Sequence, residues 1–170
     1  MDTTAFVSNI ANAMIAGDSS MADGWILLSW TLQRSGQFPQ AKAAAQTAVA
    51  RAPWSLAALD NYATILLQAQ ALDGAIALCD TAVRLAPDRV RSRILRGMAL
   101  YAKSRDPEAI KEFSRIVQLQ PRNVFAWCRM GDIYREMNDR PLSEQAYREA
   151  LRIDPYNSDA RNGLNALAQQ

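Results

Sequence analysis

The seven prolines of this 170-residue chain occupy only two phases of a 34-residue period. Four of them recur every 34 residues: Pro53, Pro87, Pro121 and Pro155. The other three each lie 14 residues before one of these four: Pro39, Pro107 and Pro141. A fixed period of this length indicates a stack of repeated supersecondary units, each of which packs against its neighbours.

The period divides most of the chain into four units when the shared proline is placed at position 32 of each. These units are residues 22–55, 56–89, 90–123 and 124–157. Within a unit, apolar and small residues recur at helical spacing in two blocks, which predicts two antiparallel helices joined by a short turn. A proline at position 18 suits the first turn of the second helix, and the proline at position 32 lies beyond the end of that helix. The sequence therefore predicts an all-α fold.

Small residues at positions 8, 20 and 27 of the units allow the two helices to approach closely; Gly97, Ala75 and Ala82 are examples. Together with these small residues, the pattern resembles the tetratricopeptide repeat (TPR) family, which places tryptophan at position 4, tyrosine at position 11, an aromatic residue at position 24 and proline at position 32. Residues 124–157 carry nearly the full pattern: Trp127, Met130, Gly131, Tyr134, Tyr147, Ala150 and Pro155. The resemblance implies a right-handed α-solenoid of four repeats.

Two segments flank the four units. Residues 158–170 follow the phase of another first helix but are largely polar, so we expect a helix that caps the stack. Residues 1–21 contain a predicted helix that begins near Asp2 or Thr3, carries a broad apolar stripe and ends at Gly17. We expect this helix to cover the open face of the first repeat. A dimer helix, or a segment that folds into the protein's own groove, is the alternative.

Composition excludes several classes of site. The chain has no histidine, which rules out a Ser/His/Asp triad and a histidine-ligated zinc site. Cys79 and Cys128 are too few for a disulfide framework, and no stretch of about 18 apolar residues occurs. The net charge of +2 does not favour nucleic acid. We expect a cytoplasmic protein that is not an enzyme, needs no cofactor or metal and does not insert into membranes.

In the TPR family, positions 2, 5, 6, 9, 12 and 13 of each repeat face a concave groove. The resemblance therefore implies a set of candidate partner-binding residues: Ile26, Trp30, Asn61, Thr64, Arg91, Ile94, Met98, Tyr101, Phe125, Arg129, Asp132 and Arg135. The groove is apolar and aromatic in its middle and carries arginines near its C-terminal end. Such a surface suits an amphipathic helix or an extended peptide with acidic residues.

Some residues depart from the family pattern or could carry chemistry. Arg93 and Arg96 take positions 4 and 7 of the third repeat, which are usually apolar. We expect them to snorkel, to pair with acids such as Asp60 or Asp80, or to present charge to a partner. Cys128 stands at a groove position and could be exposed there, but without a histidine it lacks an obvious base.

Two specialised TPR sites are absent from the sequence. The chaperone-tail carboxylate clamp and the asparagine ladder of the glycosyltransferase superhelices both need residues that this chain does not place at the required positions. The predicted function is a non-enzymatic adaptor or chaperone, of the type found in bacterial secretion or envelope assembly; the excess of arginine (16) over lysine (3) is typical of a high-GC bacterial genome. The alternative is a homo-oligomeric scaffold in which the N-terminal helix of one copy fills the groove of the next.

Overall fold

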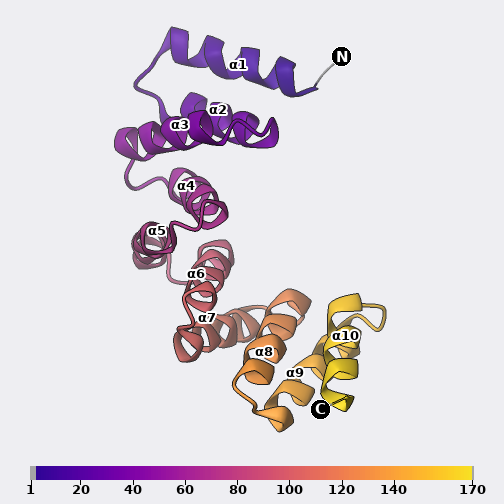
Figure 1. Ribbon diagram of the computed structural model, residues 1–170. Coiled ribbons are helices and arrows are strands. Elements are labelled where there is room, and N and C mark those ends of the chain that lie inside the picture. Colours follow the sequence, from indigo (N-terminus) through magenta and orange to yellow (C-terminus); the bar gives the residue numbers. More distant parts are fainter. Residues whose placement is uncertain (1–2, 170) are drawn as a thin grey trace. The chain divides into compact units, whose positions relative to one another are not determined.

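The computed structural model describes residues 3–169, and these residues form ten α-helices and no strand (Figure 1). The helices are α1 (Thr3–Gly17), α2 (Ala22–Arg34), α3 (Phe38–Arg51), α4 (Leu56–Gln68), α5 (Leu72–Leu85), α6 (Val90–Ala102), α7 (Asp106–Leu119), α8 (Val124–Glu136), α9 (Arg140–Ile153) and α10 (Ser158–Ala168). The chain divides into two compact units, Met1–Leu95 and Arg96–Gln170, with the division inside α6. The predicted all-α fold is confirmed.

The 34-residue period is visible in the helix boundaries. The first helices of successive repeats (α2, α4, α6, α8 and α10) begin at residues 22, 56, 90, 124 and 158. The second helices (α3, α5, α7 and α9) end at residues 51, 85, 119 and 153. Proline lies in the first turn of α3, α7 and α9, where its missing N–H has no helical acceptor to lose.

The turn between the two helices of a repeat has the same backbone conformation in every copy. Its residue at position 15 has a positive φ angle: Gly36 (74°), Gln70 (57°), Ser104 (56°) and Asn138 (60°). The next N–H then reaches back to a carbonyl five residues earlier, as from Ala71 to Leu66 at 2.8 Å. This left-handed turn satisfies carbonyls at the end of the first helix and reverses the chain.

Two kinds of hydrogen bond stabilise the turn between repeats. Ser55, Asn123 and Asn157 cap the helices that follow them, each accepting a hydrogen bond from an N–H three residues ahead. The residue at position 4 donates back to the carbonyl of position 32, as from Trp127 Nε1 to Pro121 at 3.1 Å. In the third repeat, Arg93 Nε makes this bond to the Pro87 carbonyl at 2.7 Å. Arg93 therefore takes over the structural hydrogen bond that tryptophan makes elsewhere.

The small residues lie where large side chains of the facing helix need room. In the second unit, the buried rings of Phe113 and Tyr147 lie against Gly97 and Gly131, respectively. A Cβ atom at Gly131 would lie 2.6 Å from the Tyr147 ring, so only glycine fits this contact. In the first unit, position 8 is Ser29 or Ala63 and position 24 is Ala45 or Cys79, and none of these four residues is more than 1% exposed. Helix contacts there are correspondingly close.

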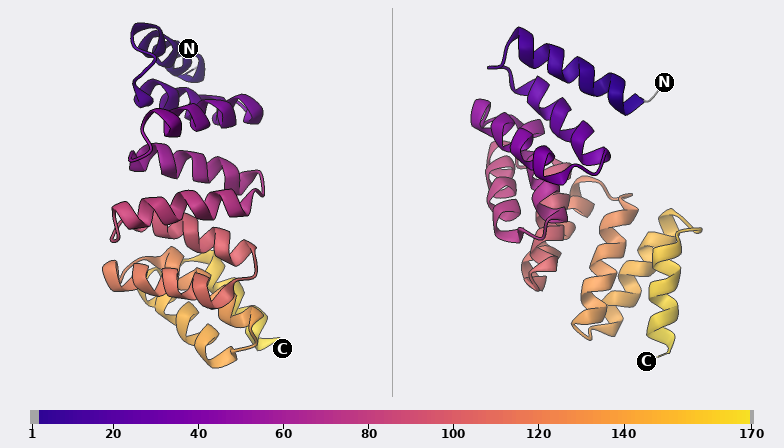
Figure 2. Two further views of the ribbon diagram at one scale, coloured as in Figure 1. Left: turned by 90° about the vertical axis from the view of Figure 1, so that its left-hand side faces the viewer. Right: turned by 45° about the horizontal axis from the view of Figure 1, so that its top comes forward.

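Helix α1 lies beside α2 in both views of Figure 2. Its buried Ala11 faces inward, and Ile15 packs so closely that a Cβ atom at Gly24 of α2 would lie 2.9 Å from Ile15 Cγ1. The helix thus covers the first repeat, as the favoured prediction states. Thr3 is the first helical residue described, and the other candidate start, Asp2, lies outside the described residues.

Candidate functional site

The predicted groove positions of α2 and α4 line one cavity of about 500 Å³ in the first unit. We call it the first groove cavity. Its lining residues are Met14, Asp23, Ile26, Leu27, Trp30, Ala57, Asp60, Asn61, Arg89 and Arg91. Ile26, Trp30, Asn61 and Arg91 belong to the twelve candidate residues. The structure therefore brings these four together from three helices, because the 34-residue period gives α2, α4 and α6 the same groove-facing positions.

One wall of the first groove cavity is apolar. Trp30 is 45% exposed, although it is a large aromatic residue. The Arg34 guanidinium lies 4.9 Å from the centre of its ring and leaves the indole beside the cavity. Below it, Asn61 Nδ2 donates a hydrogen bond to Ser29 Oγ at 2.8 Å, which fixes the amide of this nearly buried residue. The wall is thus a preformed apolar surface with an oriented amide at its base.

The polar part of the lining is built around one buried carboxylate. Asp60 is 2% exposed, and its Oδ1 accepts a hydrogen bond from Ser92 Oγ at 2.6 Å. Its Oδ2 accepts from Arg89 Nε at 2.9 Å and lies 3.6 Å from Arg91 Nε. Two arginines therefore share one carboxylate. The Arg91 side chain remains 62% exposed, so it offers positive charge at the cavity rim.

A smaller cavity of about 280 Å³ lies in the second unit between α8 and α10. Its lining residues are Arg129, Asp132, Arg135, Asp159, Asn162, Gly163 and Ala166. Three of them, Arg129, Asp132 and Arg135, belong to the candidate set. The four from α10 were not in that set, because the polar composition of this helix indicated only a cap. They stand at positions 2, 5, 6 and 9 of a fifth repeat, and this phase was the signal that could have found them.

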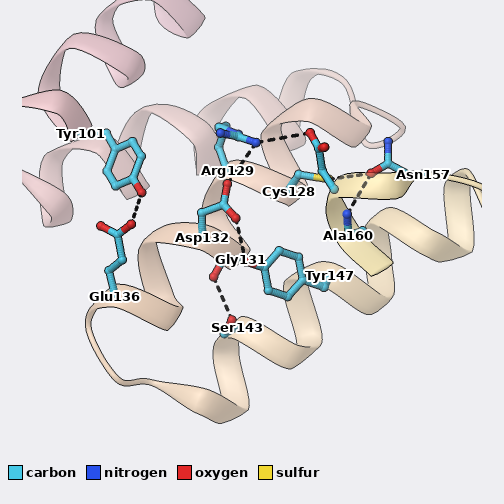
Figure 3. Close-up of polar contacts among 11 residues, drawn as sticks. Tyr101, Cys128, Arg129, Gly131, Asp132, Glu136, Ser143, Tyr147, Asn157 and Ala160 are labelled. Atoms are coloured by element: carbon cyan, nitrogen blue, oxygen red, sulfur yellow. Dashed lines mark hydrogen bonds and ion pairs between the residues drawn. The ribbon is translucent and has the colours of Figure 1, made fainter. Parts of the chain in front are cut away.

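Ion pairs hold the second cavity in shape (Figure 3). Arg129 pairs with Asp132 at 3.1 Å and with Asp159 at 3.5 Å, which ties α8 to α10. The Tyr147 hydroxyl donates to Asp132 Oδ1 at 2.7 Å. Burial, followed by this hydrogen bond, raises the pKa of Tyr147 to about 12. Among the described residues, the buried Arg135 Nε has no hydrogen-bond partner. Two arginines, two aspartates and an asparagine make this cavity polar.

The remaining five candidate residues line neither cavity: Thr64, Ile94, Met98, Tyr101 and Phe125. Thr64 Oγ1 donates to the backbone carbonyl of Asp60 at 2.7 Å. The Tyr101 hydroxyl donates to Glu136 (Figure 3). Met98 and Phe125 are 39% and 40% exposed, so both offer apolar surface. A role in partner binding stays a prediction for all twelve residues.

One expectation needs correction, and one can be made specific. Cys128 is buried, not exposed in the groove, and its Sγ donates to Asn157 Oδ1 at 3.4 Å. Burial raises the pKa of this thiol to about 11, which makes it a poor nucleophile at neutral pH. Arg96 pairs with Glu112 at 3.2 Å. The sequence could not identify this acid, because the pairing depends on how α6 and α7 pack.

A third cavity, of about 490 Å³, lies between the start of α3 and the end of α4. It is lined by Phe38, Pro39, Lys42, Ile65, Gln68 and Ala69. Of these, only Gln68, at position 13 of the second repeat, stands at a groove position. Within residues 3–169, no group of three or more His, Cys, Asp or Glu side chains could hold a metal ion. No helix in that range is long and apolar enough to cross a membrane.

Comparison with known proteins bears on the family. The tetratricopeptide repeat pattern matches residues 26–90 and 80–124, and a second pattern of the same description matches residues 124–157. A curated relative is the chloroplastic tetratricopeptide repeat domain-containing protein PYG7 of Arabidopsis thaliana, 35% identical over 71 residues. The match covers 42% of this chain and spans only 24% of that protein.

Solved structures share the fold at low sequence identity. YrrB, described as a TPR protein with an unusual peptide-binding site, superposes with a TM-score of 0.82 at 18% identity, over 93% of this chain and 81% of its own. Pseudomonas aeruginosa pilF gives 0.82 at 19% identity over 94% and 72%. MamA gives 0.79 at 17% identity over 87% and 81%. Helix periodicity, turn chemistry and these matches agree: the chain belongs to the tetratricopeptide repeat family.

Proposed function

We propose that this protein is a non-enzymatic adaptor or chaperone that binds a peptide or helix of a partner protein in its TPR groove. The observation that carries the proposal is the first groove cavity, whose lining includes a half-exposed tryptophan, Trp30, and an exposed arginine, Arg91. Folding does not require a large aromatic side chain to remain in contact with water. Tryptophan and arginine are also the residues that most often dominate the energy of protein interfaces.

The partner offers an apolar side chain to Trp30 and Ile26. The cavity volume of about 500 Å³ can accommodate a large side chain, and Met14 closes one side. The wall is already formed, since Asn61 is held by Ser29 and Trp30 is stacked by Arg34. Little conformational entropy is therefore lost on binding, which favours affinity.

The partner also carries a carboxylate. In the first cavity, Asp60 is already satisfied by Ser92 and Arg89, so the exposed guanidinium of Arg91 is available to an acidic residue. In the second cavity, Arg129 and Arg135 supply positive charge, and Arg129 is shared between two aspartates. Charge-assisted bonds to carboxylates are strong and directional. Each surface by itself therefore suits an acidic residue of an amphipathic segment.

We place this activity in the bacterial cytoplasm, in secretion or envelope assembly. The support is compositional: arginine outnumbers lysine 16 to 3, as in high-GC bacterial genomes. YrrB, which has the same fold, is described as having a peptide-binding site, and this supports a peptide as the ligand class. Self-assembly through α1 is the second candidate function, and the exposed apolar surface of that helix favours it.

The test compares two tryptophan variants in a pull-down from lysate of the native host. Trp30→Ala removes the cavity tryptophan, and Trp54→Ala removes one that is 69% exposed in the turn after α3. Proteins that the wild type and Trp54→Ala capture but Trp30→Ala loses are groove partners. Peptides from them should bind at least about tenfold more weakly to Arg91→Ala by calorimetry, as expected for a lost charge-assisted contact. Identical capture by all three proteins would contradict groove binding.

A further inference from the structure

Helix α1 has the position of a second helix in a repeat. It ends at residue 17, which is 34 residues before the end of α3. The turn that follows it is the turn found between repeats: the Met21 N–H donates to the Asp18 carbonyl at 3.3 Å, as that of Asn123 does to Gln120 at 3.0 Å. Trp25 Nε1 donates to the Ser19 carbonyl at 3.0 Å, which matches the bond from Trp127 to Pro121.

The face that a second helix turns toward the first helix of its own repeat is uncovered in α1. In the four complete repeats, position 27 has no exposed surface: Ala48, Ala82, Ile116 and Ala150. The same position in α1 is Met14, which is 38% exposed. Position 23 is 4% exposed at Ala44 but 41% exposed at Ile10. Position 20 is fully buried at Ala41 and only half-buried at Val7.

This uncovered face is apolar and uncharged. Phe6, at its edge, is 61% exposed. Val7, Ile10 and Met14 follow the alternating spacing of three and four residues at which one helix packs on another. No residue of α1 carries a charge. In the first unit, α1 is also the outermost helix (Figure 1).

We propose that this face pairs with the same face of a second copy of the chain, so that each α1 packs on the other as a first helix packs on the second helix of its repeat. The first and second helices of a repeat run antiparallel, and a two-fold axis between two α1 helices produces that orientation. Because α1 carries no charge, self-pairing involves no repulsion between like charges. A charged helix would oppose such a contact.

A head-to-tail contact between copies fits the chain less well. Helix α10 has the phase of a first helix, so it could in principle pack on α1 as the first helix of a repeat does. At positions 4 and 8 of α10, however, stand Arg161 and Asn165, both exposed. These polar groups would be buried against Ile10 and Met14 without partners, which costs free energy. The two-fold arrangement avoids this.

The two-fold axis also fixes the register. Ile10 is the middle residue of α1, so it lies opposite Ile10 of the second copy, and Phe6 lies opposite Met14. The helix has 15 residues and is therefore about 22 Å long, at about 1.5 Å per residue. Such an interface is smaller than the roughly 800 Å² per partner of a standard complex. We therefore expect a dimer that dissociates at low micromolar concentration.

The first experiment measures mass against concentration by analytical ultracentrifugation of the 170-residue chain. The wild type should shift from 18.8 kDa towards twice that mass between about 1 and 300 µM, the range expected for a small interface. Ile10→Glu should remain monomeric, whereas Asn12→Glu, an exposed position of α1 outside the uncovered face, should behave as the wild type. A monomeric wild type throughout, or equal effects of both variants, would overturn the proposal.

Cysteine cross-linking tests the register without weakening the interface. The native Cys79 and Cys128 are buried and should not react. Ile10→Cys should form a disulfide-linked dimer on mild oxidation. Phe6→Cys alone should not, because the two copies of residue 6 lie about 12 Å apart along the paired helices. A mixture of Phe6→Cys and Met14→Cys should form the heterodimer. Strong self-linking of Phe6→Cys would mean a parallel pair and would overturn the proposal.

The proposal is independent of groove binding. Met14 belongs both to the uncovered face and to the first groove cavity, so disruption is tested at Ile10, which does not line that cavity. Trp30→Ala should leave the dimer unchanged. Loss of partner capture without loss of dimer, or the reverse, separates the two activities.

Discussion

At the scale of single residues, the turn inside each repeat requires a positive φ angle at one position, and only one of the four repeats has glycine there. Position 15 has a positive φ angle in all four repeats, but only Gly36 is free of a Cβ atom. Gln70, Ser104 and Asn138 adopt the same left-handed conformation. For a residue with a side chain this conformation costs about 1–2 kcal/mol, and asparagine tolerates it best. Gln70 therefore stores the most evident strain of the three.

We predict that Gln70→Gly raises the free energy of unfolding by about 1 kcal/mol, because glycine relieves the left-handed strain while giving up some entropy. Gly36→Ala should lower it by a similar amount. Urea denaturation followed by circular dichroism measures both. Asn138→Gly is the matched control and should change less than Gln70→Gly. A destabilised Gln70→Gly protein would show that the side chain makes a contact worth more than the strain.

At the scale of helices, one aromatic ring organises the C-terminal end. The Tyr147 side chain of α9 is fully buried and packs against glycines of two other helices, Gly131 of α8 and Gly163 of α10. A Cβ atom at Gly163 would lie 2.2 Å from this ring. The ring cannot retreat easily, because its hydroxyl is held by Asp132. Docking of α10 therefore depends on the absence of one methyl group.

We predict that Gly163→Ala destabilises the protein by about 1–3 kcal/mol, although alanine is the better helix former by about 1 kcal/mol. Overpacking against Tyr147 outweighs the gain in helix propensity. Gly17→Ala is the control, since nothing lies within 4 Å of an added Cβ atom there. Urea denaturation compares the two. Equal stability of both variants would indicate that α10 shifts without cost.

At the scale of the whole molecule, folding raises the proton affinity of groups that titrate at alkaline pH. Burial is the largest cause at both Cys128, with a pKa of about 11, and Tyr147, with a pKa of about 12. Unfolding returns both groups to water and lowers both pKa values. Between the unfolded and folded pKa values the folded protein binds more protons, so its stability is complete at neutral pH and falls as the pH rises.

We predict that the free energy of unfolding falls by about 2 kcal/mol or more between pH 8.5 and 11, a figure that follows from the pKa displacement of Cys128. Cys128→Ala should lose less stability over the same range, because it lacks one of the titrating groups. Guanidinium denaturation at fixed ionic strength measures this. The Cys128 thiol should also resist a thiol reagent at pH 8 in the folded protein. A flat stability profile would contradict these assignments.

The first and the last described helix differ in the polarity of their exposed residues. By phase, α1 corresponds to a second helix of a repeat and α10 to a first helix. In α10, exposed polar residues such as Arg161 and Asn165 suit contact with water. In α1, Phe6 and Ile10 leave an apolar face. A polar helix face is compatible with water and an apolar one is not, and this contrast between the two helices is why we propose α1 as the interacting one.

The sequence by itself determined the all-α class, the 34-residue period and the family, because proline phase and helical periodicity are local properties that recur in every copy. The phase of the groove positions also anticipated the lining of the first cavity, including Trp30 and Arg91. Only the tertiary structure decided which charges pair. Arg96 forms an ion pair with Glu112, and two arginines form ion pairs with Asp60. The partners in each pair lie on different parts of the fold, so the pairing depends on the direction of the side chains after packing.

The same distinction explains Cys128 and α1. Cys128 stands at a groove position by phase, yet the packing of α10 buries it. The apolar stripe of α1 was visible in the sequence, but which half of it faces α2 was not. Ala11 and Ile15 turn inward, while Ile10 and Met14 remain exposed. A period predicts which residues share a helix face, and only the neighbouring helices decide whether that face is covered.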